Sequence, residues 1–239
     1  GLEVVWADDD GAQTPVEAFT LESSLEPSVS YDGDSVVVTV AGTHELSVLA
    51  LDRFGRQQTA AAAVDVQAGD AATLSLTLSD SVIEAGGVTL ATLSAVDGFG
   101  NDVDTADAVL EAAEGALVDG LGVTATQVGD YEVRATLGEP SAETSFAVVA
   151  APAAAIDLVI DAESAEVGDS VGYSTAVVDA YGNSVDATVE LSLPTGVVDG
   201  GDSLRFDADG LYECVAVVAG TDLTDTETVV VDSNGPSLL

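Results

Sequence analysis

Five oxygen-bearing side chains occur in two short phrases whose spacing could suit a metal ion. Asp97, Asn101 and Asp102 lie in the first phrase, and Asp179 and Asn183 occupy matching positions in the second. Calcium prefers several carboxylate, amide and carbonyl oxygens, so these five residues are candidate calcium ligands. However, aspartate is abundant throughout the chain, and Gly-Asn is ordinary turn chemistry. We therefore expect no metal and no other cofactor, with calcium at these residues as the alternative.

The single histidine and the single cysteine are the other residues that could do chemistry. His44 could act as a base, but later copies of the same phrase have tyrosine at its position, which favours a structural role. Cys214 lies in an alternating segment, so we expect a small buried side chain, and one cysteine forms no intrachain disulfide. The sequence has no glycine-rich phosphate loop, no metal-spaced His/Cys set and no nucleophile elbow. We expect that the chain is not an enzyme.

Two phrases recur with nearly the same period. VGDYEV at 128–133 returns as DGLYEC at 209–214, an offset of 81 residues, and AVDGFGN at 95–101 returns as VVDAYGN at 177–183, an offset of 82. A weaker copy of the first phrase, Gly42–Glu45, occurs near the start. Because separate motifs share one period, the sequence predicts tandem domains.

We expect three domains and name them by sequence. They are the N-terminal segment, residues 1–67; the middle repeat, residues 68–150; and the C-terminal repeat, residues 151–239, which includes a short tail.

Alternating apolar and polar residues between turn signals predict an all-β fold. In the middle repeat we expect strands at 73–78, 88–96, 109–112, 123–126, 131–137 and 144–149. In the C-terminal repeat they are expected at 155–160, 171–178, 189–193, 204–206, 212–218 and 226–231. In the N-terminal segment they are expected at 2–6, 35–40, 46–51 and 59–66, with 52–56 in a hairpin. About seven short strands in roughly eighty residues favour a Greek-key β-sandwich.

Both repeats contain a phrase that resembles the tyrosine corner of immunoglobulin-like domains. Gly129 precedes Tyr131 as Gly210 precedes Tyr212, and in such corners the tyrosine hydroxyl bonds to nearby backbone. The cysteine expected in the second strand is absent, so the disulfide of those domains is not implied. The phrases at 95–101 and 177–183 resemble the turn of bacterial immunoglobulin-like repeats in invasin- and intimin-type adhesins. The resemblance covers about residues 70–232 and implies three tandem immunoglobulin-like Greek-key β-sandwich domains, but little about function.

After the repeats, the second main feature of the sequence is its large negative charge. The chain has 43 acidic residues against four arginines, contains no lysine and carries a net charge of −39, yet 47% of its residues are hydrophobic. It can therefore bury cores while acids cover the surface, and their mutual repulsion is screened in molar salt, where the Debye length is about 3 Å. This composition resembles that of haloarchaeal proteins; an acidic protein from an ordinary organism is the alternative. Such a surface repels nucleic acid, and no apolar run is long enough to span a membrane.

These features predict a non-enzymatic virion structural protein of a virus infecting a halophilic archaeon. It would be a turret, capsid decoration, or tail or fibre component that projects immunoglobulin-like domains for surface display or host attachment. The chain shows no export signal, which favours this location over the alternative, a haloarchaeal surface-layer or adhesin-like protein segment. A sugar-binding module is disfavoured because few aromatic residues are available for an exposed platform.

The N-terminal segment contains residue types that are enriched at protein contacts. They are Trp6, Phe19, Arg53, Phe54 and Arg56. We expect this segment to form an oligomeric or capsid-anchoring interface, with a second copy, other virion or cell-surface proteins, or a host surface receptor as partners. The alternative is that this segment is only a diverged copy, in which Arg53 and Arg56 reduce local repulsion between carboxylates.

Overall fold

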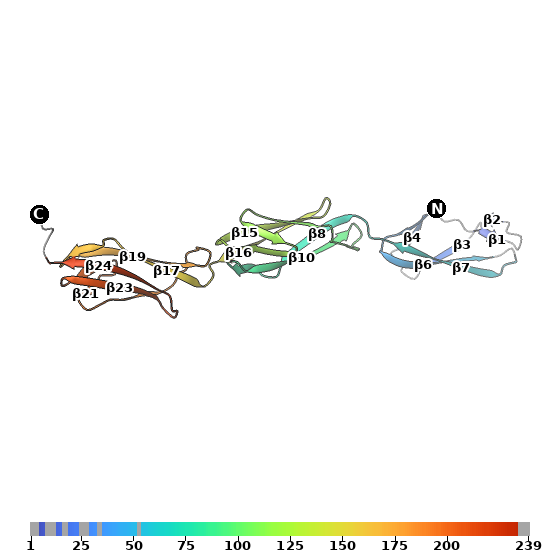
Figure 1. The fold of residues 1–239 in the computed structure, drawn as a ribbon. Helices are drawn as coiled ribbons and strands as arrows, with labels where there is room; N and C mark the ends of the chain where they lie inside the picture. Colours follow the sequence, from blue (N-terminus) through green and yellow to red (C-terminus); the bar gives the residue numbers. More distant parts are fainter. Residues whose placement is uncertain are drawn as a thin grey trace. The chain divides into compact units, whose positions relative to one another are not determined.

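The fold is all-β, as predicted. The computed structural model describes residues 5–7, 13–15, 19–23, 29–32, 35–51 and 54–233, and within these ranges it contains strands and turns but no helix (Figure 1). Consequently these ranges contain no helix that could cross a membrane.

The N-terminal segment contains three small sheets in its described ranges. Strand β1 (Val5–Ala7) pairs with β2 (Gln13–Pro15), and β4 (Val29–Asp32) pairs with β5 (Ser35–Val38). The third sheet has the order β3 (Phe19–Ser23), β6 (Gly42–Leu51), β7 (Gln57–Val66). The expected hairpin does join β6 to β7, but β6 begins four residues before the predicted strand, and β2, β3 and β4 were not predicted.

The middle repeat has two sheets. One has the order β11 (Asp102–Val103), β10 (Val88–Asp97), β14 (Gly122–Ala125), β13 (Ala116–Asp119), with β8 (Ala71–Leu78) also paired to β10. The other has the order β12 (Val109–Ala112), β15 (Gly129–Thr136), β16 (Ser141–Val149), β9 (Val82–Glu84). Strand β9 pairs with β16 in parallel.

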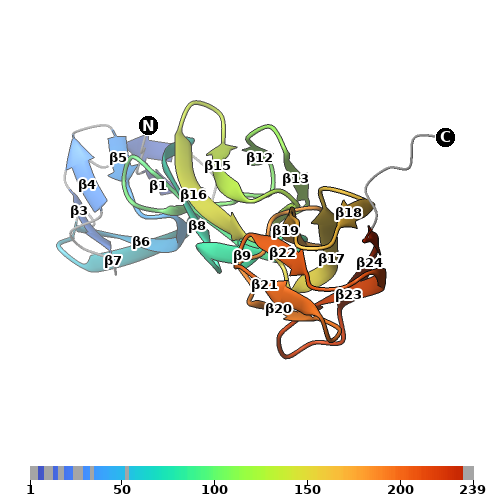
Figure 2. The same ribbon diagram turned by 90° about the vertical axis from the view of Figure 1, so that its left-hand side faces the viewer.

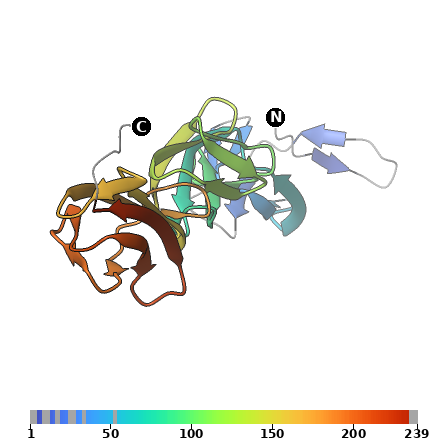
Figure 3. The same ribbon diagram turned by 60° about the vertical axis from the view of Figure 1, so that its left-hand side comes forward.

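The C-terminal repeat has the same plan. One sheet has the order β17 (Ala153–Ile160), β19 (Ser170–Asp179), β22 (Ser203–Phe206), β21 (Val197–Asp199). The other has the order β18 (Ser164–Glu166), β24 (Thr224–Asp232), β23 (Gly210–Val218), β20 (Val189–Ser192). The two sheets form two layers, drawn gold to dark red in Figures 2 and 3. Apart from β11, in whose place there is only a single bridge between Val178 and Ser184, this order matches that of the middle repeat, including a parallel β18–β24 pair. A duplicated domain predicts this outcome.

The described chain divides into two compact units. One holds the described residues up to 77 together with 92–110 and 134–143, and the other holds 78–91, 111–133 and 144–233. The boundary between the two units passes through the middle repeat. Each unit contains one copy of the Asp-x-aromatic-Gly-Asn phrase, together with the hydrogen-bond partners of that copy described below.

The core of the C-terminal repeat comes from alternate residues of both sheets. Cys214 is fully buried there, as predicted, and burial raises the pKa of its thiol. The cluster consists of Leu158, Val171, Leu204, Phe206, Tyr212, Cys214, Ala216, Val229 and Val231.

Each repeat packs one phenylalanine against its corner tyrosine, but from opposite sheets. In the middle repeat the Phe146 ring, on β16, lies 5.5 Å from that of Tyr131. In the C-terminal repeat the Phe206 ring, on β22, lies 5.3 Å from that of Tyr212. The positions of the smaller residues are exchanged as well. Ala125 at the end of β14 corresponds to Phe206 at the end of β22, and Val229 on β24 corresponds to Phe146 on β16. Both cores thus contain one phenylalanine packed on the corner tyrosine, but it comes from a different strand in each repeat.

This exchange predicts a compensating pair. Phe206→Ala should reduce the stability of the C-terminal repeat by about 3–5 kcal/mol, because it leaves a cavity in the core. Adding Val229→Phe should restore part of that loss, since it recreates the arrangement of the middle repeat. Slow amide exchange in β23 measures the stability of this repeat in the full chain.

The control for this pair is Phe206→Ala with Val230→Phe, because Val230 is 52% exposed and cannot fill the core. A double variant with Val229→Phe that is no more stable than this control would contradict the packing account.

Candidate functional site

The Asp-x-aromatic-Gly-Asn phrase forms the same turn twice. In residues 97–101 the N–H of Asp97 donates to the carbonyl of Asn101 at 2.9 Å, and the N–H of Gly100 donates to that of Asp97 at 3.1 Å. The corresponding distances in residues 179–183 are 2.9 and 3.2 Å. The glycine in the fourth position has φ of 87° and 84°, a left-handed conformation that glycine adopts without strain. We call the two segments the Asp–Asn turns.

The aspartate of the first turn is surrounded by donors. Its side chain is buried, and Oδ1 accepts the N–H groups of Phe99 at 2.8 Å and Asn101 at 2.9 Å. Oδ2 accepts the Asn101 side-chain amide at 2.8 Å and the N–H of Gly69 at 2.9 Å. The hydrogen bond from the Asn101 side chain, followed by that from Gly69, holds the pKa of Asp97 far below the usual carboxyl range. The carboxylate therefore stays charged and joins the turn to residue 69, ahead of β8.

The second turn repeats this arrangement. Asp179 Oδ1 accepts the N–H groups of Tyr181 and Asn183, both at 2.9 Å. Oδ2 accepts the Asn183 side-chain amide at 2.8 Å and the N–H of Ala151 at 3.0 Å. Burial opposes the charged form, but the hydrogen bonds from Asn183, Ala151 and Tyr181 outweigh it and lower the pKa of Asp179 to about 2. Among the side chains whose burial the structure describes, Asp97 and Asp179 are the only acidic ones that are buried.

Each turn's asparagine bonds to a backbone segment far away in the sequence. Asn101 accepts the N–H of Ala41 and donates to the carbonyl of Thr39, both at 2.8 Å. A side-chain amide offers a donor and an acceptor, as a peptide unit does, so it can pair with residues two apart as a neighbouring strand would.

The second asparagine makes the same pair of bonds. Asn183 accepts the N–H of Val128 at 3.0 Å and donates to the carbonyl of Thr126 at 2.8 Å. We call residues 39–41 and 126–128 the docking segments. In both turns the aspartate also accepts a hydrogen bond from the asparagine amide, so it orients the group that reaches the docking segment.

The middle residue of each docking segment is held by the corner residue four positions later. The Tyr131 hydroxyl donates to the carbonyl of Gln127 at 2.9 Å, and His44 Nε2 lies 2.6 Å from the carbonyl of Val40. Because a carbonyl only accepts, Nε2 of this buried histidine carries the proton. His44 therefore takes the place of the corner tyrosine in the N-terminal segment, the structural role expected from its position.

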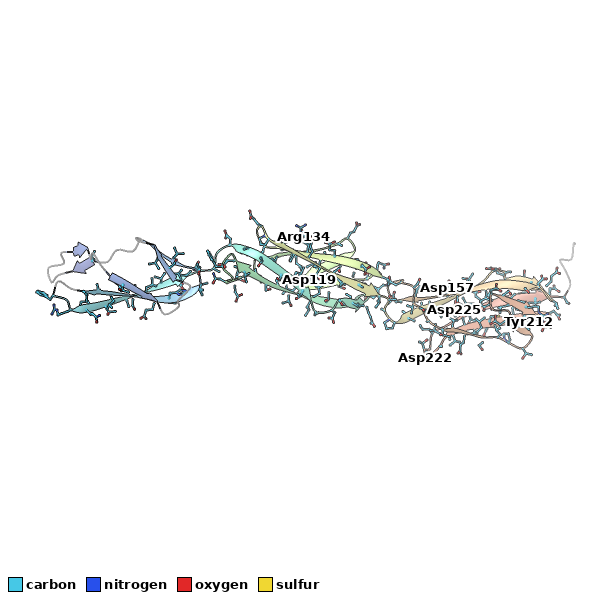
Figure 4. The ribbon with its side chains drawn as sticks, turned by 180° about the vertical axis from the view of Figure 1, so that it is seen from behind. Asp119, Arg134, Asp157, Tyr212, Asp222 and Asp225 are labelled. Carbon is cyan, nitrogen blue, oxygen red and sulfur yellow. The ribbon has the colours of Figure 1, made fainter. Side chains whose placement is uncertain are left out.

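The C-terminal repeat has the same corner. The Tyr212 hydroxyl donates to the carbonyl of Ala208 at 2.9 Å (Figure 4). An added Cβ at Gly129 would lie in ordinary contact, 3.8 Å from the Tyr131 ring, whereas Gly210 has a φ of +155°, a conformation that other residues rarely adopt. The hydroxyl bond is therefore the feature that both corners share, and only the second corner needs its glycine.

Four of the five candidate calcium ligands instead form hydrogen bonds within the protein. Asp97, Asn101, Asp179 and Asn183 bond to backbone and to one another, whereas Asp102 is exposed at the start of β11. The N–H groups around each buried carboxylate direct their positive ends at the oxygens that a cation would need. In the described part of the chain, no group of three or more His, Cys, Asp or Glu residues is placed to hold a metal. The arrangement joins segments of chain by hydrogen bonds.

The residues predicted to form an interface are only partly described. Arg53 and the side chains of Trp6 and Phe19 lie outside the described residues. Phe54 is 68% exposed, and the Arg56 guanidinium lies 5.3 Å from the centre of its ring, a cation–π contact. The interface assignment stays a prediction.

No family model and no curated protein matches this chain. Among solved structures it is similar to invasin, a bacterial integrin-binding protein, with 16% identity and a TM-score of 0.51 over 96% of this chain and 56% of invasin's. It is also similar to the Escherichia coli adhesin FdeC, with 20% identity and a TM-score of 0.47 over 90% and 85%. A third similar structure is the S-layer protein rSbsC, with 17% identity, a TM-score of 0.38 and coverage of 97% of this chain but 38% of that one. At these identities the likeness to invasin supports the fold, tandem immunoglobulin-like β-sandwiches.

The lowered pKa of Asp179 predicts a pH-dependent contribution to stability. In Asp179→Asn the new NH₂ group would face the N–H of Ala151 and the Asn183 amide, so two donors would lose their acceptor. A depressed folded pKa stabilises the fold above the unfolded value of about 3.9, and this contribution disappears as the pH falls through about 2. The melting temperature of the variant should therefore lie below that of the wild type at pH 5, and the difference should shrink between pH 4 and 2.

The control is Asp186→Asn, which removes an exposed carboxylate three residues after the turn. It should show no such convergence with the wild type. A difference between Asp179→Asn and the wild type that stays constant down to pH 2 would contradict the role given to the charged carboxylate.

Proposed function

We propose that the chain is a non-enzymatic, surface-displayed protein segment in which tandem immunoglobulin-like domains hold a binding end at a set distance from a base. The domains would be residues 1–67, 68–150 and 151–239. One observation carries the proposal: the Asp–Asn turn recurs with the same hydrogen bonds, from Asn101 to Thr39 and from Asn183 to Thr126. With the domains divided as above, each turn would bond to the domain before it. A spacer needs ordered contacts between its domains. Two copies of the same hydrogen bond from asparagine to backbone suit that role better than they suit catalysis.

A halophilic setting is part of the proposal. Apart from Asp97 and Asp179, the acidic side chains whose burial the structure describes are exposed or half-buried. The two described arginine ion pairs, Arg134–Glu143 at 3.6 Å and Arg205–Asp207 at 3.0 Å, are themselves about half exposed. Exposed pairs contribute little to stability, and they cannot balance a net charge of −39. Screening by salt would relieve the remaining repulsion.

The location that we favour is the cell surface of a halophilic archaeon, as part of a surface layer or an adhesin. A virion turret, capsid decoration or fibre built from the same domains is the second location, because the charged surface and the ordered junctions suit it equally. In either place the partners would be copies of the chain, neighbouring surface proteins or a host receptor.

Location can be tested by gold-labelled antibodies against this chain, applied to intact cells of the source organism and to particles purified from the culture. Label on the cell envelope would support the cell-surface assignment, and label confined to particles would support the virion. Label found only inside opened cells would overturn surface display.

Salt dependence follows from the charge. The melting temperature should rise as sodium chloride increases from about 0.1 to 3 M, because exposed carboxylates repel one another less. The matched variant neutralises three exposed aspartates, Asp119→Asn, Asp157→Asn and Asp222→Asn (Figure 4), and it should melt with a weaker salt dependence. A midpoint that does not change across this range would refute the halophilic setting.

A further inference from the structure

The C-terminal repeat has its own copy of the docking segment, residues 207–209. It occupies the same place before the corner tyrosine as 126–128 does, and its middle carbonyl, that of Ala208, accepts the Tyr212 hydroxyl as that of Gln127 accepts the Tyr131 hydroxyl. In the described part of the chain, however, nothing donates to the carbonyl of Asp207, and the N–H of Asp209 has no acceptor. The two groups that asparagine holds in the earlier copies thus have no partner among the described residues.

A contact that the middle repeat makes at a glycine also has no counterpart in the described part of the C-terminal repeat. Gly86 has φ +78°, and a Cβ there would overlap the hydroxyl of Tyr181, which belongs to the Asp–Asn turn docked on this repeat. Gly168 is its counterpart, since the N–H of Gly86 donates to Ala125 and that of Gly168 donates to Phe206, both at 2.8 Å. Gly168 also has a positive φ, +92°, and no atom of the described residues lies within 4 Å of its Cβ position. No described side chain therefore fills the space above Gly168 that an aromatic hydroxyl fills above Gly86.

We propose that residues 207–209 and Gly168 form a docking site for a further immunoglobulin-like repeat that presents an Asp-x-aromatic-Gly-Asn turn. Its asparagine would accept the N–H of Asp209 and donate to the carbonyl of Asp207, and its aromatic side chain would lie over Gly168. The site is polar and selective, because one group of the partner must supply both a hydrogen-bond donor and a hydrogen-bond acceptor.

A second copy of this chain does not fit the site. Both of its Asp–Asn turns are already bonded to their own docking segments. The related phrase at 52–56 has Arg56 in the asparagine position, and a guanidinium has donors but no acceptor for the N–H of Asp209.

The acidic side chains beside the site do not prevent docking. Arg205 pairs with Asp207 at 3.0 Å and offsets its charge. The aspartate of an incoming turn would be enclosed by N–H groups of its own repeat, as Asp179 is. Molar salt would screen the remaining repulsion from Asp209.

The test replaces residues 234–239 with one further repeat of known sequence. A second copy of residues 151–233 is joined directly after Ser233, which preserves the spacing between Val149 and Ala151 because Val149 and Asp232 end equivalent strands. The matched control carries Asn→Ala at the position of Asn183 in the added copy only. Amide hydrogen exchange is measured in about 2 M salt, with Val128 as the internal reference for an occupied docking segment.

The proposal predicts that the Asp209 amide exchanges more slowly by about fivefold or more in the extended chain than in the control, while Val128 is the same in both. Equal exchange of Asp209 in the extended chain and the control would overturn the docking site. Protection of Asp209 in the unextended chain that grows with protein concentration would overturn the choice of partner, since it would mean that a second copy fills the site.

Discussion

The structure depends on a carboxylate that is buried and fully occupied by hydrogen-bond donors. Four N–H bonds surround Asp97, and four surround Asp179, from the turn itself, the following asparagine and a residue ahead of the repeat's first strand. A buried charge is costly unless such bonds replace water, and once they do, removing any partner leaves the rest unsatisfied. The aspartate thereby fixes the asparagine, and the asparagine fixes the docking segment.

This use of two aspartates differs from that of the other acids. Most of the acidic side chains in the described residues lie on the surface, where they repel one another and depend on salt for relief. The buried pair is protected from solvent, so its hydrogen bonds should be much less sensitive to ionic strength. In the halophilic setting proposed above, the hydrogen bonds of the Asp–Asn turns would change little with salt, whereas the stability of the β-sandwiches would follow the salt concentration.

Sequence reasoning predicted the parts whose signals are local. Apolar residues between turn signals located β8, β12 and β19 to within two residues, and the shared phrase assigned His44 to the position of a tyrosine. The three-residue strands β9 and β18 were missed because each is held by parallel pairing to a distant strand, which leaves little pattern in three residues. The role of the asparagines was missed for a similar reason, since their backbone partners lie 55 to 62 residues away. The repeated period could have suggested this role of the asparagines, because it places one Asp–Asn turn and one corner phrase in each of the two repeats.

The asparagine of each turn holds the preceding docking segment through two hydrogen bonds. Amide hydrogen exchange of the full chain with Asn183→Ala measures the contribution of these bonds, with Asn101→Ala as the matched variant at the other turn. Loss of Asn183 should speed exchange of Val128 by about fivefold or more and leave Ala41 unchanged, while loss of Asn101 should do the reverse. If Val128 and Ala41 exchange at wild-type rates in both variants, the asparagines do not hold these segments and the account is wrong.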